Sequence, residues 1–250
     1  MYESDIFQNK TALVTGGARG IGRAVCLMLA QYGARVAVNY RENREAADET
    51  VHRIEKSGGE GIAIRADVSA EKDVEEMVVA VRSQWGPIDL LVNNAGVVET
   101  VAHGTVTFEG WKRMFAVNAD GPFLTTWAVK DDMIARGYGR IVNVSSLAGV
   151  VPKDNQIHYG SAKAALIAFT RHCARAFAPH NIRVNCVAPG LTNTALAQQA
   201  DPGLVADIVA ITPMGRMGEP EEIASTVKYL LSDDSSFVTG QTINACGGRT

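Results

Sequence analysis

Short apolar runs alternate along the chain with longer stretches in which apolar residues recur every three to four positions. The short runs are typical of buried strands, and the longer periodic stretches are typical of helices with one buried face. Strands that alternate with helices in this way indicate a parallel sheet covered on both faces. The expected strands are 11–15, 35–39, 62–65, 89–93, 140–145, 182–187 and 241–245.

The helices are expected in the intervals between these strands. Glycines at positions 33 and 58 follow two helical stretches, where glycine commonly ends a helix. Right-handed crossovers then give a single Rossmann-type, doubly wound α/β domain with a parallel seven-stranded sheet. The expected helices are 21–32, 44–57, 71–84, 109–136, a helix that carries position 159 and ends near 177, and 220–231.

Composition narrows the class of protein. The 250 residues fit one domain over 1–250, and the 24 glycines fit many tight turns. A net charge of −3 favours neither nucleic acid nor an anionic membrane as partner. No apolar run approaches the roughly 18 residues of a membrane helix. The cysteines form no metal-ligand motif, so we expect no metal, reduced buried thiols and a cytoplasmic location; they are Cys26, Cys173, Cys186 and Cys246.

The first expected strand breaks into a glycine-rich turn. Gly16, Gly20 and Gly22 are spaced G-x-x-x-G-x-G, and Ile21 begins the apolar face of the next helix. Backbone N–H groups at a helix N-terminus lack partners, and together with the helix dipole they favour an anion. Small residues also let a pyrophosphate approach the backbone. On spacing alone, a cofactor turn and a plain turn are equally good interpretations.

Tyr159 and Lys163 are the second candidate site. They lie four residues apart on one expected helix and therefore share a face. Tyrosine has a pKa of about 10, and a nearby ammonium lowers it. The phenol can then pass a proton to a carbonyl oxygen. Each residue alone is more commonly part of a solvated helix face, but their combination with the glycine turn favours a chemical role.

Three further motifs occur in a fixed order with these two. Asn93-Asn94-Ala95-Gly96 follows a strand, Ser146 precedes Tyr159 by thirteen residues, and Pro189-Gly190 follows the sixth strand. In this order and spacing, the sequence resembles the short-chain dehydrogenase/reductase family from roughly residue 8 to the C-terminus. The resemblance implies the reduction of a ketone to a secondary alcohol by hydride transfer from NADPH.

The same resemblance implies four catalytic positions. Tyr159 is expected to be the general acid, and Ser146 to hydrogen-bond the reacting oxygen. Lys163 is expected to hold the nicotinamide ribose as well. Asn118, in Ala-Val-Asn, matches the family position that bends its helix and holds a water in a proton relay. Considered singly, each of these residues is more commonly a cap, loop or helix-surface residue, and their joint occurrence with the glycine turn favours the catalytic interpretation.

The cofactor preference rests on the end of the second strand. NAD-specific relatives carry an acidic residue there, where this chain has Tyr40 followed by Arg41. Arg41 and Arg19 are expected to bind the 2′-phosphate of NADP(H) through charge-assisted hydrogen bonds. The alternative is that both are solvated, with Arg41 paired to Glu42. The expected cofactor contacts are Gly16, Arg19, Gly20, Ile21, Gly22, Tyr40, Arg41, Asp67, Val68, Asn94, Ala95, Gly96, Tyr159, Lys163, Pro189, Gly190, Thr192 and Thr194.

Several of these positions have structural alternatives. Asp67 either contacts adenine beside Val68 or serves as a turn or cap residue. The segment from Pro189 to Thr194 is expected to close over the nicotinamide, and 191–216 to form a mobile lid. Segments 97–106 and 150–158 are expected to line the substrate pocket with this lid.

The sequence motifs leave several substrate classes open. The closest resemblance is to 3-oxoacyl-[acyl-carrier-protein] reductases, which implies a thioester or other small carbonyl substrate. Basic residues that dock the carrier in those relatives are replaced by Gly137 and His180, although Arg136 is adjacent. A sugar or polyol dehydrogenase and a non-catalytic NADP(H)-binding sensor are the alternatives. Cys246 stands where the family often has Asp in a terminal Val-Asp-Gly-Gly.

Aromatic residues suggest an assembly. They are concentrated on the two helices that relatives pair across a two-fold axis, so a homotetramer is expected. These residues are Trp111, Phe115, Phe123, Trp127, Phe169 and Phe177.

Overall fold

A computed structural model describes residues 5–249 and contains the predicted parallel sheet. The strand order is β3-β2-β1-β4-β5-β6-β7, and every adjacent pair is parallel. The order reverses between β1 and β4, so the fold is doubly wound as predicted. The strands are β1 (Thr11–Val14), β2 (Arg35–Tyr40), β3 (Glu60–Arg65), β4 (Leu90–Asn93), β5 (Gly139–Val144), β6 (Ile182–Pro189) and β7 (Thr242–Ala245).

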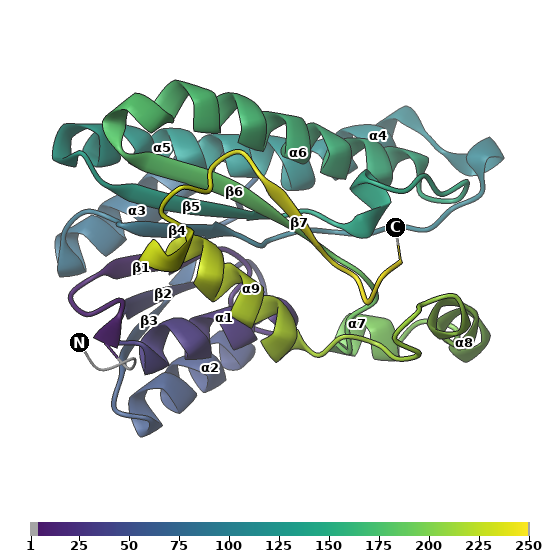
Figure 1. Cartoon of the computed structure of the whole chain (residues 1–250), viewed down its shortest axis with the longest axis horizontal. Helices are drawn as coiled ribbons and strands as arrows, with labels where there is room; N and C mark the ends of the chain where they lie inside the picture. The colour runs from purple at the N-terminus through teal and green to yellow at the C-terminus, as the bar shows by residue number, and fades with distance from the viewer. Residues whose placement is uncertain (1–4, 250) are drawn as a thin grey trace.

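Helices cover both faces of the sheet (Figure 1). One face packs against α1 (Gly20–Gln31), α2 (Arg44–Lys56) and α9 (Pro220–Leu231). The other packs against α3 (Glu71–Trp85), α5 (Gly121–Arg136) and α6 (Ile157–Phe177). The central strands are buried along their whole length because their side chains enter one core or the other.

The helix expected over 109–136 is not a single α-helix, and the structure corrects that prediction. It consists of α4 (Phe108–Phe115), a π-helical turn (Ala116–Asp120) and α5. A π-turn widens the helix and is frequent at functional sites. The prediction fails because the apolar spacing on either side of the turn still fits a continuous helix. Asn118 lies in the turn and is fully buried.

Two short helices project from the sheet layer at one end (Figure 1). These are α7 (Ala195–Gln198) and α8 (Pro202–Ala210), and α8 contains no fully buried residue. They lie within the segment expected to be a lid. No helix over 5–249 is both long and apolar enough to span a membrane. All four cysteines are buried free thiols, as predicted.

The aromatic residues of α5 and α6 form a cluster of tilted and edge-on rings that is only partly covered. Phe123 and Trp127 have ring centroids 4.4 Å apart, and Phe169 packs against both rings. Phe123 remains 40% exposed and Trp127 remains 42% exposed. An exposed aromatic surface of this kind is compatible with a subunit contact, and the homotetramer stays a prediction.

Candidate active site

The glycine turn between β1 and α1 is built without room for side chains. Gly16 has a φ of +63° and Gly20 a φ of +55°, a backbone region that favours glycine. A Cβ at Gly22 would lie 2.2 Å from the carbonyl oxygen of Gly16. The Asn94 side-chain amide donates to the carbonyls of Thr15 at 2.9 Å and Gly16 at 3.1 Å. The turn therefore presents backbone to a ligand, as a pyrophosphate site requires.

Two residues that the sequence analysis did not identify hold this turn. The Thr15 hydroxyl accepts hydrogen bonds from the backbone N–H groups of Asn94 and Ala95, each at 3.0 Å. The Asn39 side-chain oxygen accepts from the N–H of Gly16 at 3.1 Å. These bonds join the ends of β1, β2 and β4. No local motif indicates them because the partners come from separate strands.

Ser146, Tyr159 and Lys163 meet at one cavity beyond the carboxyl end of β5. The Ser146 hydroxyl accepts from the N–H of Ala148 at 3.1 Å and is hydrogen-bonded to Tyr159. The adjacent Ser145 hydroxyl instead donates to the carbonyl of Lys163 at 2.8 Å, so it anchors strand to helix. The two adjacent serines therefore make different contacts, and the choice of Ser146 over Ser145 stays a prediction.

The electrostatics of this cluster differ from the sequence-based expectation. Burial raises the pKa of Tyr159, and the hydrogen bond with Ser146 only partly opposes that rise. The Lys163 ammonium donates to the carbonyl of Val144 at 2.9 Å and lies 6.0 Å from the Tyr159 ring centroid. Because Lys163 is directed toward that carbonyl, the expected lowering of the tyrosine pKa is absent. Burial also lowers the pKa of Lys163 to about 8.

Asn118 joins the π-turn to the loop that follows β4. Its amide nitrogen donates to the carbonyls of Val97 at 2.9 Å and Met114 at 3.0 Å, and its oxygen accepts from the N–H of Val97 at 3.3 Å. A Cβ at Gly96 would lie 2.8 Å from that oxygen and 3.3 Å from the Lys163 nitrogen. Gly96 thus lets the loop lie directly over two of the four expected catalytic residues.

A second contact, which no sequence motif indicated, holds the loop that follows β4. The Glu99 carboxylate bonds the ring of His158 at 3.0 Å and the guanidinium of Arg113 at 2.8 Å. The hydrogen bond with His158 is the main reason that the pKa of Glu99 is lowered. His158 is buried and directly precedes Tyr159. The loop is therefore tied to the first turn of α6.

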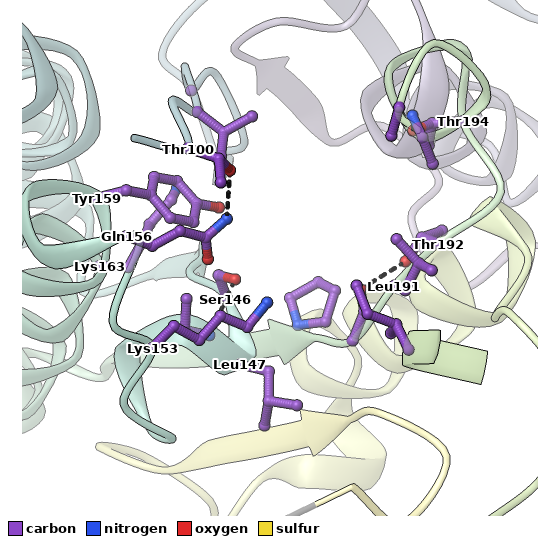
Figure 2. A pocket seen from close by; sticks show the side chains of 18 of the residues that line it. Thr100, Ser146, Leu147, Lys153, Gln156, Tyr159, Lys163, Leu191, Thr192 and Thr194 are labelled. Atoms are coloured by element: carbon purple, nitrogen blue, oxygen red, sulfur yellow. Dashed lines mark hydrogen bonds between the residues drawn. The ribbon is translucent and has the colours of Figure 1, made fainter. Parts of the chain in front are cut away.

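The cavity has a volume of about 690 Å³. Figure 2 shows Tyr159, Ser146 and Lys153 on one side of it, and Thr192 and Thr194 on the other. The segments expected to line the pocket do contribute to it. Its lining comprises Val97, Val98, Thr100, Lys153 and Gln156 from those segments, several residues of the expected lid, and Arg249, which no sequence motif indicated.

The loop after β6 reaches from the sheet to the glycine turn. The Thr192 hydroxyl donates to the carbonyl of Gly190 at 3.2 Å. The Thr194 hydroxyl accepts from the N–H of Ala197 and caps α7. A Cβ at Gly20 would lie 3.2 Å from the Thr194 methyl group. Pro189 and Gly190 also line the cavity, so the loop after β6 borders both the cavity and the glycine turn.

The residues at the expected adenosine end of the cofactor site make different kinds of contact. Tyr40 is 8% exposed and packs in the core. Arg41 contacts Glu42 at 2.5 Å and Asp67 at 3.9 Å, so the expected pairing with Glu42 is present.

Asp67 also serves as the turn residue that the sequence allowed. It accepts from the N–H of Ser69 at 2.9 Å and from its hydroxyl at 2.6 Å. Val68 is buried beside Gly121, where a Cβ would lie 3.0 Å from the valine side chain. Arg19 is exposed and has no carboxylate within 4.0 Å among the described residues.

Known proteins resemble this chain over nearly its full length. A family model described as enoyl-(acyl carrier protein) reductase matches residues 16–250. A 3-oxoacyl-[acyl-carrier-protein] reductase from Synechocystis is 38% identical over 242 residues, which cover 96% of each chain. An uncharacterized oxidoreductase from Methylorubrum extorquens is 42% identical over 244 residues, covering 96% of this chain and 98% of that protein.

Solved structures agree with these relatives. The crystal structure of a 3-oxoacyl-[acyl-carrier protein] reductase from Brucella melitensis superposes with a TM-score of 0.91 at 35% identity. It covers 98% of this chain and 93% of that one. The sheet order, the glycine turn and the order of motifs are accounted for by a single conclusion: the chain belongs to the short-chain dehydrogenase/reductase family of oxidoreductases.

Proposed function

We propose that this protein is an NADPH-dependent reductase that converts a ketone to a secondary alcohol. The observation that carries the proposal is the convergence of Ser146, Tyr159 and Lys163 on one cavity beside the glycine turn. When bound, NADPH would supply the hydride for the carbonyl carbon and become NADP+. Tyr159 donates its phenolic proton to the carbonyl oxygen, so the C=O double bond becomes a C–O single bond with new C–H and O–H bonds.

Ser146 and Lys163 prepare this proton transfer. The Ser146 hydroxyl bonds the phenol and lies where it can also hydrogen-bond the reacting oxygen as negative charge develops on it. With a pKa of about 8, Lys163 is largely cationic at neutral pH. Its ammonium is proposed to hold the ribose hydroxyls of the cofactor. Asn118 supports a proton relay to Lys163 through the backbone of Val97 and a bound water.

The chain offers a fitting site for the cofactor. A Cβ at Gly22 would fill the space beside Gly16, so the glycine turn leaves its backbone free to hold a pyrophosphate. Arg19 and Arg41 supply two guanidinium groups for a 2′-phosphate, and Tyr40 leaves no acid at the end of β2 to repel it. The remaining expected contacts, including Asp67 and Val68 at adenine and the loop to Thr194 at the nicotinamide, belong to the same proposal.

The similarity to 3-oxoacyl-[acyl-carrier-protein] reductases makes 3-oxoacyl thioesters the first substrates to test. Sugar and polyol dehydrogenation is the second enzymatic candidate, and cofactor sensing without turnover is the non-enzymatic one. A homotetramer and a cytoplasmic location remain predictions of the same proposal.

The test follows NADPH fluorescence while the purified protein is mixed with acetoacetyl-coenzyme A, a small diketone or a keto sugar. We expect NADPH consumption with an equal amount of secondary alcohol formed, and slower consumption of NADH. Tight binding of NADPH without turnover of any carbonyl would favour the sensor and overturn the proposed function.

A further inference from the structure

Two cationic side chains line the substrate end of the cavity. Lys153 comes from the segment between β5 and α6, and Arg249 comes from the segment after β7. Figure 2 shows the Lys153 amino group pointing into the cavity, on the side that holds Ser146 and Tyr159. Lys153 and Arg249 are each partly buried. Two segments that are nearly a hundred residues apart thus bring positive charge close to the proposed proton donor.

These charges lack acidic partners within the described part of the chain. No carboxylate there lies within 4.0 Å of either side chain, whereas Arg113 and Arg216 each contact a glutamate. Burial lowers the pKa of Lys153, and the nearby charge of Arg249 lowers it further. Two cations that line one cavity without acidic partners in the described part of the chain destabilise the protein, and an anion bound between them relieves that cost.

The other residues that line the cavity favour an anion that is part of the substrate. Among the described lining residues, Asp201 is the sole carboxylate, and it accepts from the N–H of Leu204 as the cap of α8. Leu147, Leu204 and Ile208 supply an apolar wall suited to a short carbon chain. The cations proposed for the cofactor phosphate, Arg19 and Arg41, lie outside this lining. The charge at Lys153 and Arg249 is therefore additional to the charge that the cofactor needs.

We propose that the ketone substrate is an oxo acid whose free carboxylate is bound by Lys153 and Arg249. This inference rests on the proposed ketone reduction and refines its substrate class. A thioester of the same acid lacks this carboxylate charge. Docking of an acidic carrier is also poorly supported, because Arg136 is held by Asp89 at 2.6 Å and by the carbonyl of Ile88 at 2.8 Å.

The experiment compares each oxo acid with its neutral counterpart. The substrates are acetoacetate and levulinate, their methyl esters, and acetoacetyl-coenzyme A. We expect the wild type to reduce at least one free acid with a higher kcat/KM than its ester or the thioester. Lys153→Gln and Arg249→Gln should each lower kcat/KM for that acid by about ten- to a hundredfold, mainly through KM. Neither change should affect the ester.

Lys112→Gln is the matched control, since Lys112 is exposed and pairs with Glu109 at 2.8 Å on α4. It should leave kcat/KM unchanged for every substrate. A wild type that prefers the esters or the thioester overturns the inference while leaving ketone reduction intact. Equal losses on acid and ester in Lys153→Gln overturn it as well.

A binding measurement separates this inference from the proposed function. Calorimetric titration with butanoate, and with butanamide as its neutral control, needs no turnover. We expect butanoate to bind the wild type and to bind Lys153→Gln at least tenfold more weakly, by the same charge-assisted contact. If no carbonyl is reduced, the proposed function fails, and the butanoate titration still decides whether the anion site exists. Butanoate binding that is no stronger than butanamide binding removes that site.

Discussion

The two ends of the cavity are built in opposite ways. At the glycine turn, backbone groups from β1, β2 and β4 lie in close contact, and the controlling residues are Gly16, Gly22 and Asn94. At the substrate end, side chains arrive from distant segments, among them Lys153 and Arg249. The glycine turn is proposed to hold the cofactor, which is the same for every substrate, and it tolerates little change in sequence. The substrate end can change its side chains without altering the backbone that positions the chemistry.

The proposed catalytic residues lie between these ends and belong to neither type. Ser146 and Lys163 are fixed by contacts to backbone, as the glycine turn is. Their functional atoms nevertheless face the open cavity, as those of the substrate end do. The following changes test this division, from the largest expected effect to the smallest.

Tyr159→Phe tests the residue between the two ends. Removing the phenolic proton donor should lower kcat by ~10²–10⁴-fold, the range typical of general acid catalysis. NADPH should still bind, because the glycine turn is untouched. The measurements are steady-state turnover and NADPH fluorescence titration. Tyr229→Phe, a partly exposed tyrosine on α9, is the control. Turnover close to that of the wild type in Tyr159→Phe would exclude the assignment.

Arg41→Ala tests the charge at the cofactor end. The loss of one charge-assisted contact to the 2′-phosphate should reduce kcat/KM for NADPH by about ten- to a hundredfold. The value for NADH should barely change. Arg44→Ala is the matched control, because Arg44 is an exposed arginine three residues away that pairs with Asp48 at 3.3 Å. Equal use of NADPH and NADH by the wild type would contradict the proposed cofactor preference.

Gly22→Ala tests the claim that the glycine turn has no spare room. The added methyl would meet the carbonyl of Gly16 and the amide of Asn94, so the free energy of unfolding should fall by roughly 1–3 kcal/mol. NADPH affinity should fall with it. Urea unfolding and fluorescence titration measure the two effects. Gly104→Ala, where a Cβ meets no atom within 4 Å, should change neither. Unchanged stability in Gly22→Ala would show that the turn can rearrange.

A separate test follows pH, because the pH dependence of Lys163 has opposite signs for binding and stability. Its pKa is about 8 in the folded protein and ordinarily 10.5, so between these values the folded state binds fewer protons than the unfolded state. The contribution of Lys163 to stability therefore increases as pH rises from about 8 toward 10.5. NADPH affinity should fall over the same range, by up to about tenfold per pH unit, because the ammonium is lost.

Fluorescence titration and urea unfolding across this pH range measure both trends. Lys163→Met removes the titrating group, so it should bind NADPH weakly at every pH and lose the pH-dependent gain in stability. A wild-type NADPH affinity that is constant above pH 8 would contradict a pKa of about 8 for Lys163 and its proposed role at the ribose.

The sequence by itself determined the fold class and the positions of the strands and most helices. Short apolar runs and apolar residues that recur every three to four positions are local patterns, and each βα unit carries its own turn signals. The four-residue spacing of Tyr159 and Lys163 predicts that they share a helix face, and the thirteen-residue separation from Tyr159, taken from the family resemblance, selects Ser146 over Ser145. Family resemblance supplied the roles, which remain proposals.

Tertiary structure decided the features that depend on contacts between distant segments. The π-helical turn at Asn118 is one, because the side chain in that turn bonds Val97 on the loop after β4 as well as Met114 on its own helix. The burial of Tyr159 is another, because it raises a pKa that the sequence was expected to lower.

The placement of Lys153 and Arg249 on one cavity is the third feature of this kind. Local sequence specifies backbone conformation within a few residues. Electrostatic energies depend instead on burial and on separations in space, and only the packed sheet brings these groups together.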